Sequence, residues 1–291
     1  DETIQKANIS GYNLFDLQTN LDLDSTFNAK AIFRTRSPFG TSFGSKTDFE
    51  FRLFSMGGNL NGLKYQLGDI RVELTPYTVF NADLAGTGYE SSIFTERREI
   101  LEYENFNDGN TWLLQGASGQ YGWNLGEEAG IGIYAFTTRL ASTNELGLPD
   151  RMLSGGRVEY ALNKSIKLGV NDVGLYDIQT GSTEYDYTNN VVTGDINSST
   201  LLGNNNLTVN VEFGGSWFSY TQNATDSNQS YTDMIVDFDA DYNLKNTGID
   251  IGVGAKMVGA SFMSPTAQSR RYMPTATPML FEKLADGAIR S

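Results

Sequence analysis

The sequence contains no cysteine and no histidine in 291 residues. Without cysteine it has no disulfide framework, no thiolate nucleophile and no cysteine-ligated zinc or iron–sulfur centre. Without histidine it has no Ser-His-Asp triad and no histidine-based zinc motif. Much hydrolase and redox chemistry is thereby excluded. We therefore expect no catalytic residues, no metal and no cofactor.

Positive charge is also scarce, because 21 Lys+Arg stand against 35 Asp+Glu and the formal net charge is -14. Nucleic-acid phosphates are bound by basic surfaces, so we expect no nucleic-acid partner. No stretch approaches the ~20 consecutive apolar residues of a membrane helix. The chain also begins without the basic start and apolar core of a signal peptide. If the protein is exported, we expect the numbering to be that of the mature chain.

The chain is instead rich in alternation of apolar and polar residues with a period of two. Between residues 15 and 24, apolar residues and threonine take the odd positions, while Asp, Asn and Gln take the even ones. Four more segments repeat the pattern: 27–36, 47–53, 234–244 and 249–257. Weaker versions predict further strands at Leu63–Leu74, Ile100–Phe106, Gly130–Thr138, Arg157–Leu162, Ser165–Leu175 and Leu207–Tyr220. The pattern predicts an all-β, antiparallel chain of roughly 12–14 strands.

Two long polar stretches, Tyr176–Asn206 and Thr221–Asp233, are rich in Thr, Asn, Ser and Asp, and we interpret them as the longest loops. Prolines gather near the end of the chain, where they exclude central strands. They are Pro265, Pro274 and Pro278. We therefore divide the chain into a β-barrel region over 1–262 and a non-strand segment over 263–291. The second is interpreted as a tail, a plug or the start of a continuation.

The polar faces of the predicted strands carry full charges of both signs. If these faces line a water-filled lumen, the candidate lumen-facing residues are Lys30, Arg34, Arg36, Asp48, Glu50, Arg52, Arg71, Glu73, Asp237, Asp239 and Asp241. The last three have the spacing of the first acids of a calcium loop. However, Tyr242 stands where that loop needs glycine and Gly248 where it needs glutamate, so a strand's polar face is the better interpretation. On a lumen wall these acids would favour cations or pair with arginine.

The alternation alone does not decide which face is outside. A soluble sandwich packs its apolar faces together, whereas a porin turns them to lipid and its polar faces to water. Several segments have the roughly 9–11 residues of a strand that crosses a bilayer. Aromatic residues also lie near expected strand ends, which is typical of interfacial girdles. The pairs are Tyr77/Phe80, Tyr121/Trp123 and Trp217/Tyr220. Both features favour the barrel.

With the missing cysteine and the Gly- and Tyr-rich composition, these features resemble a bacterial outer-membrane β-barrel protein of the porin-like kind. The likeness covers residues 10–262, and two short strings add to it: Leu67-Gly-Asp-Ile70 through Leu74-Thr-Pro-Tyr77, and Phe262–Arg271. The resemblance implies a transmembrane barrel in the outer membrane, with the lipid bilayer, other envelope proteins or further copies as partners. The family usually ends on an aromatic strand, and Leu284–Ser291 does not, so further strands beyond residue 291 stay an open interpretation.

Three functions stay open at this point. A barrel would give passive passage to small hydrophilic solutes or serve as a structural subunit of an envelope complex. A soluble or surface-attached β-sandwich would bind carbohydrate through exposed Trp and Tyr. A glycan-active enzyme would need two carboxyl groups about 5–10 Å apart. Candidate pairs are Asp48/Glu50, Glu102/Glu104 and Glu127/Glu128. We favour the barrel.

Overall fold

The structure is a computed structural model. It describes residues 12–23, 26–38, 47–81, 114–141, 150–178, 186–199, 206–221, 228–244 and 249–268. Within these ranges every regular element is a strand, so the predicted all-β class is confirmed. A helix of the length and apolarity needed to traverse a membrane does not occur among the same residues.

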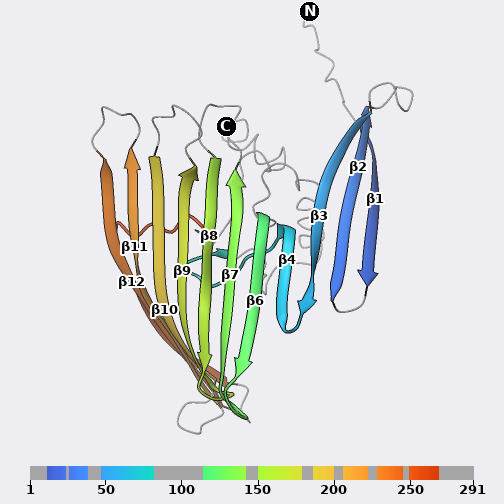
Figure 1. Ribbon diagram of the computed structural model, residues 1–291. Coiled ribbons are helices and arrows are strands. Elements are labelled where there is room, and N and C mark those ends of the chain that lie inside the picture. The colour runs from blue at the N-terminus through green and yellow to red at the C-terminus, as the bar shows by residue number, and fades with distance from the viewer. Residues whose placement is uncertain are drawn as a thin grey trace, which may run out of the picture.

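One antiparallel sheet of 12 strands dominates the fold (Figure 1). Each strand of this sheet pairs with the sheet strand that follows it along the chain. The strands are β1 (Tyr12–Leu23), β2 (Phe27–Pro38), β3 (Asp48–Leu60), β4 (Leu63–Ile70), β6 (Leu114–Asn124), β7 (Gly130–Ala141), β8 (Asp150–Ala161), β9 (Ile166–Ile178), β10 (Asp186–Ser198), β11 (Leu207–Thr221), β12 (Gln229–Leu244) and β13 (Ile249–Val258). β5 (Phe80–Asn81) and β14 (Ala267–Gln268) form a separate parallel pair. The sheet is open, because β1 and β13 are its edges and do not pair with each other in the described chain.

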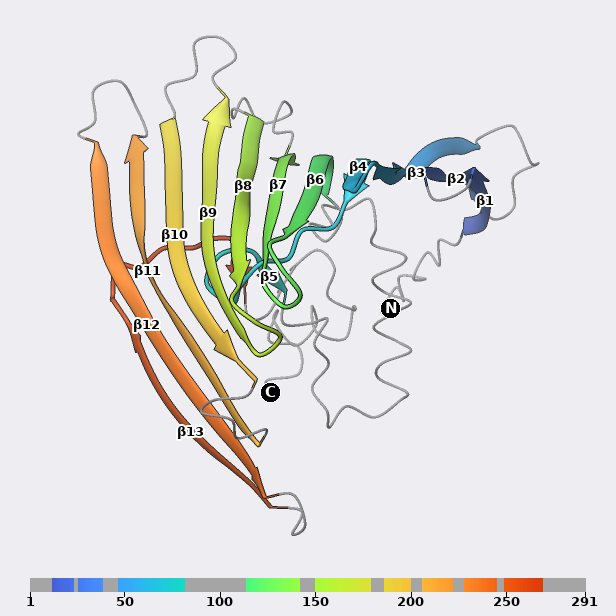
Figure 2. The same ribbon diagram turned by 60° about the horizontal axis from the view of Figure 1, so that its bottom comes forward.

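The sheet forms a deep arc over β6–β13, while β1–β3 extend away from it (Figure 2). The two parts are joined by a short ladder, because β3 pairs with β4 only over residues 55–60. The Phe54 amide donates to the Asp69 carboxylate over 2.6 Å, which ends the ladder there. Gly68 has φ of 89°, and a Cβ on it would lie 2.2 Å from the Phe54 carbonyl oxygen. Only glycine fits this close approach.

In the two polar stretches that we predicted to be the longest loops, most of the described residues lie in strands, so the interpretation of each stretch as one long loop needs correction. The stretch Tyr176–Asn206 contains all of β10, and Thr221–Asp233 contains the start of β12. The polar side chains of β10 misled the prediction because they face into the fold. Asn189, Thr193 and Asp195 are buried rather than solvated.

Two further strand predictions need correction. The expected strand Leu63–Leu74 ends at Ile70, where the chain leaves the sheet. Strand β6 was not predicted at all, because its centre is Gly-Ala-Ser-Gly and has no apolar alternation. The expected strand Ile100–Phe106 lies outside the described residues.

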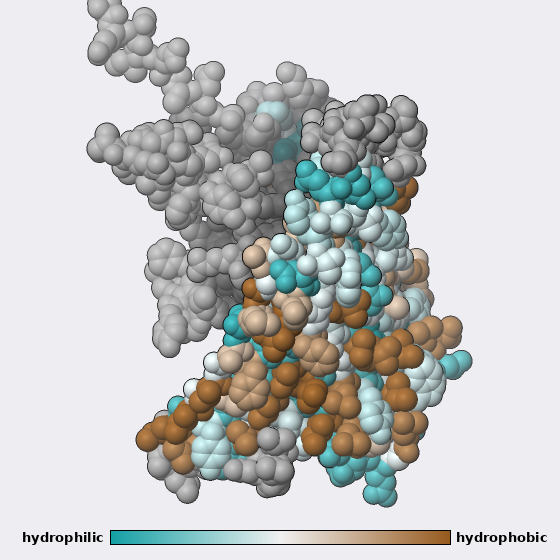
Figure 3. All heavy atoms as spheres, turned by 90° about the vertical axis from the view of Figure 1, so that its left-hand side faces the viewer, coloured by the Kyte–Doolittle hydropathy of each residue, from teal (hydrophilic) through white to brown (hydrophobic). Residues whose placement is uncertain are grey.

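The pairing register sorts the side chains into rows that cross the sheet on opposite faces. One row on the convex face is apolar from β7 to β13: Ile133, Val158, Val170, Gly194, Phe213, Val236 and Met257. The neighbouring row on the concave face, which we name the charged row, has five charged residues and one glycine: Glu159, Gly169, Asp195, Glu212, Asp237 and Lys256. Viewed from the side of β11 and β12, hydrophobic residues gather over the lower part of the surface and hydrophilic ones above them (Figure 3).

The buried apolar cluster of the described chain lies on the concave face, where residues after β4 cross the sheet. Its members are Ile70, Val72, Val79, Leu114, Phe136, Leu153, Val173 and Leu175. In the segment 63–74 the apolar residues change from odd positions, at Leu63 and Leu67, to even positions, at Ile70 and Val72, and this cluster explains the change. Leu63 and Leu67 point to the convex side, whereas Ile70 and Val72 point into the cluster. No register shift between β4 and β6 is involved.

Candidate functional site on the concave face

Residues 71–81, which we name the strap, leave β4 and cross the concave side of the sheet (Figure 2). A tight turn shapes the strap, with Pro76 in its second position, where proline pre-sets the backbone. The Thr78 amide donates to the Thr75 carbonyl over 3.1 Å, and the Thr75 amide donates to the Thr78 hydroxyl over 3.1 Å. The Thr-Pro-Tyr string of the sequence is therefore the turn of the strap.

Residues 259–268, which we name the clamp, follow β13 back across the same face. The Asn189 side-chain amide donates to the Met263 carbonyl over 2.9 Å, and the Met263 amide donates to the Ser216 hydroxyl over 2.9 Å. The Ser261 amide donates to Asp233 over 2.8 Å. The clamp is therefore fastened to β10, β11 and β12.

The clamp also holds the strap. Ser264 donates to the Tyr77 carbonyl over 2.8 Å, and Thr266 donates to the Thr78 carbonyl over 2.6 Å. The parallel pairing of β14 with β5 extends this contact. The first residues of the segment 263–291 were predicted to contain no strand. The presence of β14 corrects that expectation, and residues 269–291 lie outside the described chain.

The strap is anchored to the charged row by two hydroxyl groups. Thr75 donates to a Glu212 carboxylate oxygen over 2.5 Å, and the Tyr77 hydroxyl donates to Asp237. The Lys256 ammonium lies 3.4 Å from Asp237 and 4.9 Å from the centre of the Tyr77 ring. Burial raises the pKa of Tyr77, and the Asp237 carboxylate raises it further, against the opposing effect of Lys256. The phenol therefore stays protonated and acts as the donor.

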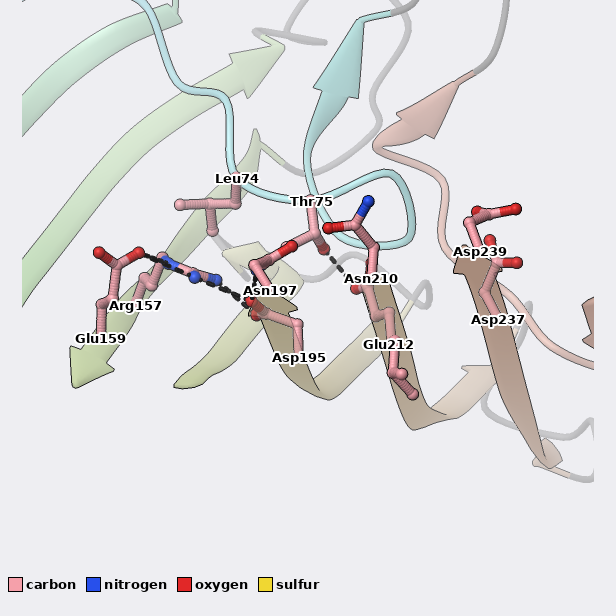
Figure 4. Close-up of a pocket in the computed structure, with 11 residues that line it drawn as sticks. Leu74, Thr75, Arg157, Glu159, Asp195, Asn197, Asn210, Glu212, Asp237 and Asp239 are labelled. Carbon is pink, nitrogen blue, oxygen red and sulfur yellow. Dashed lines mark hydrogen bonds and ion pairs between the residues drawn. The ribbon is translucent and has the colours of Figure 1, made fainter. Parts of the chain in front are cut away.

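A cavity of about 310 Å³ lies between the strap and the sheet (Figure 4). It is lined by Leu74, Thr75, Arg157, Glu159, Asp195, Asn197, Asn210, Val211, Glu212, Asp237 and Asp239. Five of these side chains are carboxylates and one is a guanidinium, so the cavity carries net negative charge. Every acid except Glu159 comes from β10, β11 or β12.

Arg157 is the centre of the largest hydrogen-bond network in the cavity. It donates to both oxygens of Asp195, over 2.6 and 2.9 Å, and to Glu159 over 3.0 Å. Asn171, which is fully buried, donates to the Asp195 carboxylate over 3.0 Å. A two-pronged pair of this kind fixes both position and orientation.

Gly169 lies in the charged row beneath the Arg157–Asp195 pair. A Cβ on this glycine would lie 2.4 Å from an Arg157 nitrogen and 2.4 Å from an Asp195 oxygen. The missing side chain leaves the space in which the two charged groups meet across β9.

A second cavity of about 450 Å³ adjoins the clamp. It is lined by Pro76, Tyr77, Lys256, Val258, Phe262, Ser264 and Ala267. The rings of Tyr77 and Phe262 meet edge to face, with 6.4 Å between their centres. Asp237 lines the first cavity and its two partners line the second, so the contact of Tyr77, Asp237 and Lys256 stands between the two cavities.

The predicted acids of β12 fall on the concave face, and the first two line the first cavity. Asp237, Asp239 and Asp241 lie within one strand, so they are its polar face and not a calcium loop. Asp237 pairs with Lys256 instead of an arginine. In the part of the chain that the structure describes, no group of acidic residues is arranged to hold a metal ion.

The predicted charges of β2 and β3 form a separate cluster, away from both cavities. Buried Arg34 and Arg52 converge on Asp16, over 2.6 and 3.2 Å. Lys30 is exposed on β2, and Arg36 stands opposite Asp48 in the register. Glu50 stands opposite Arg34, and its side chain lies outside the described part.

Two predicted lumen charges are not on the sheet. Arg71 and Glu73 lie on the strap, both exposed, and pair with each other over 3.4 Å. Their prediction as strand residues is wrong because the alternation continues past the point where β4 ends. Sequence reasoning missed Arg157, Asp195 and Glu212. Arg157 and Glu212 occupy polar positions in a period-two pattern, whereas Asp195 lies in the stretch that we interpreted as a loop.

The predicted aromatic girdle pairs divide between the two faces. Tyr121 and Trp123 lie together on the convex side of β6, with 4.6 Å between ring centres. Trp217 is also convex and exposed, whereas Tyr220 and Tyr77 are on the concave side. The Phe80 side chain lies outside the described part.

A scan against models of known protein families finds none that matches this chain, and a search of curated proteins finds no significant match. The function is therefore inferred from the geometry of the molecule.

Proposed function

We propose that this sheet is the wall of an outer-membrane β-barrel that gives restricted passage to small hydrophilic solutes. Its convex face meets lipid and its concave face lines water. The observation that carries the proposal is the inverted burial of the two faces. Val253 and Phe15 of the convex face are 63% and 61% exposed, while charged Arg34 and Asp195 of the concave face are buried.

Inverted burial is costly for a protein surrounded by water. Monomeric soluble proteins rarely expose contiguous apolar patches beyond a few hundred Å², and burying charge is expensive unless it is paired. A bilayer reverses the first cost, because lipid replaces water against the apolar face. The cost of burying charge is offset by the ion pairs of Arg157 and Arg34.

Strand length and direction also support a barrel. β13 has 10 residues with an apolar convex side, which is the length of a strand tilted across a bilayer. Each strand is antiparallel to the next, so β1 and β13 of the 12-stranded sheet run in opposite directions. Neighbouring strands in a closed barrel with an even number of strands have that relation.

The competing functions are less well supported. A sandwich covers its apolar face with a second layer, but the exposed apolar convex face is not covered by the strap or the clamp, which lie on the concave face against the charged row and the buried apolar cluster. A glycosidase needs two available carboxyl groups, and Asp195 and Glu212 are neighbours in the register. However, Asp195 is held by Arg157 and Glu212 accepts a hydrogen bond from Thr75. A structural subunit would share the same wall, but two cavities on its concave side favour passage.

The chain offers a clean test, because it has no cysteine that would react in the background. Single cysteines are placed on β12 at convex Val236 and Phe238 and at concave Asp239 and Asp241, and each is labelled with a fluorophore in lipid vesicles. We expect nitroxide lipids to quench the first two labels and aqueous iodide to quench the last two. The unmodified chain should need detergent and migrate faster on a gel unheated than boiled.

The opposite results are equally informative. If the chain stays soluble without detergent, shows no heat-dependent mobility, and iodide reaches all four labels, the convex face meets water. The membrane proposal then fails, and a carbohydrate-binding sandwich becomes the leading function.

A further inference from the structure

We infer that the contact of Tyr77 with Asp237 and Lys256 is the constriction of the passage, and that the clamp fixes its width. This inference rests on the proposed function and names the residue that sets the size limit for solutes. Among the described residues, two segments cross the concave face: the strap and the clamp.

The strap packs tightly against the concave face toward β6–β9. Toward β11–β13 it leaves an open path, and Tyr77 stands in that path. Toward β6–β9, Val72 and Val79 pack into the apolar cluster, and Thr78 is fully buried. A polar solute cannot move through that packed region. Toward β11–β13 lie the two cavities, and Tyr77 stands where one gives way to the other. A solute that moves along the concave face therefore meets the phenol ring.

Tyr77 is held in place through its hydroxyl, its ring and its carbonyl. Its hydroxyl is bound to Asp237, its ring lies under the Lys256 ammonium and against Phe262, and its carbonyl accepts from Ser264. Ser264 is 187 residues away along the chain. Because the clamp is itself bonded to β10 and β11, the strap cannot lift without breaking the clamp's hydrogen bonds.

This arrangement is a fixed filter. The strap is fastened by side chains from the far end of the chain, so the ring does not swing freely into or out of the passage. The size of the side chain at residue 77 then determines which solutes pass, and shortening it joins the two cavities into one channel.

The test measures channel conductance in planar bilayers and the entry of sugars of graded size into liposomes. We expect Tyr77→Ala to raise conductance by about twofold or more and to admit larger sugars, since pore-lining side chains set the radius. Tyr187→Ala is the matched control, because Tyr187 is a half-buried concave tyrosine that lines neither cavity. It should leave both readouts unchanged, and heat-dependent gel mobility establishes that each variant is folded.

A second variant covers the case in which Tyr77→Ala does not fold. Tyr77→Cys places the only thiol of the chain at the constriction. We expect its conductance to exceed that of the parent and to fall again when a bulky methanethiosulfonate reagent modifies the thiol. If the parent forms channels but folded variants at residue 77 keep its conductance and sugar limit, the inference is overturned and the proposed function stands. If the parent forms no channel at all, the proposed function fails and the inference fails with it.

Discussion

The two faces of this sheet follow opposite rules of burial, even within single strands. On β9, Val170 is 57% exposed and its neighbour Asn171 is 0% exposed. On β11, Phe213 is 52% exposed and Glu212 is 8% exposed. Soluble proteins show the reverse order. The difference teaches that alternation only creates two faces, and that burial depends on what lies against each of them.

The strap and the clamp lie against the charged row of the concave face, and several buried polar groups there have a hydrogen-bond partner. The strap supplies hydroxyl donors to two carboxylates, and Arg157 and Asn171 supply donors to a third. No described segment lies against the convex row. The difference between the faces can therefore be tested in two ways, by removing a hydrogen-bond partner on the concave face or by adding a charge to the convex face.

The largest effect is expected from Asp195→Ala. This change leaves the guanidinium of Arg157 without its principal acceptor, and removing one partner of a buried pair costs about 3–5 kcal/mol of unfolding free energy. Denaturant unfolding of the protein in detergent or vesicles measures the loss. Asp195→Asn keeps one acceptor oxygen and should lose less. Equal stability of the alanine variant and the parent would show that the network contributes nothing.

A slightly smaller loss is expected when charge is added to the convex face. Phe213→Arg places a guanidinium against lipid, which costs about 2–4 kcal/mol near the middle of a bilayer and less near its edges. The matched control is Asn210→Arg on the same strand, because residue 210 lines the negatively charged cavity. Unfolding in vesicles should show a loss for the first variant only. A neutral Phe213→Arg would mean that water contacts this face.

The same contrast explains which strands could be predicted from the sequence. β1, β12 and β13 place apolar residues on the convex face and polar ones opposite, so their period of two is visible. β10 places Thr193 and Asp195 inward, and these polar groups are buried by hydrogen bonds that composition does not reveal. The strand therefore looked like a solvated loop.

The candidate site was predictable only in part. The spacing of Asp237 and Asp239 correctly indicated one polar strand face, because that relation is local. The strap is not local: Thr75 meets Glu212 across 137 residues, and Tyr77 meets Asp237 across 160. No pattern within a strand encodes such contacts. Arg71 and Glu73 were misplaced for the related reason that alternation does not mark where β4 ends.

The smallest of the three effects on stability is expected from Gly169→Ala, which tests the network through space. The added methyl group would lie 2.4 Å from both Arg157 and Asp195, so the pair has to shift, and overpacking of this kind costs about 1–3 kcal/mol. Gly132→Ala is the control, since residue 132 is in line with Glu159 in the same row and a Cβ there meets nothing within 4 Å. It should be neutral or slightly stabilising in the same unfolding measurement.

The double variant Gly169→Ala with Asp195→Ala then identifies the cause of the loss. If the methyl group acts by displacing the ion pair, it costs less once Asp195 has been truncated. The double variant then loses less unfolding free energy than the sum of the two single losses. If the losses add in full, the glycine is required by the backbone of β9 and not by the pair above it. The non-additive result would show that the concave face of β9 is shaped around a charged group, whereas its convex face, at Val170, is shaped only by an apolar surrounding.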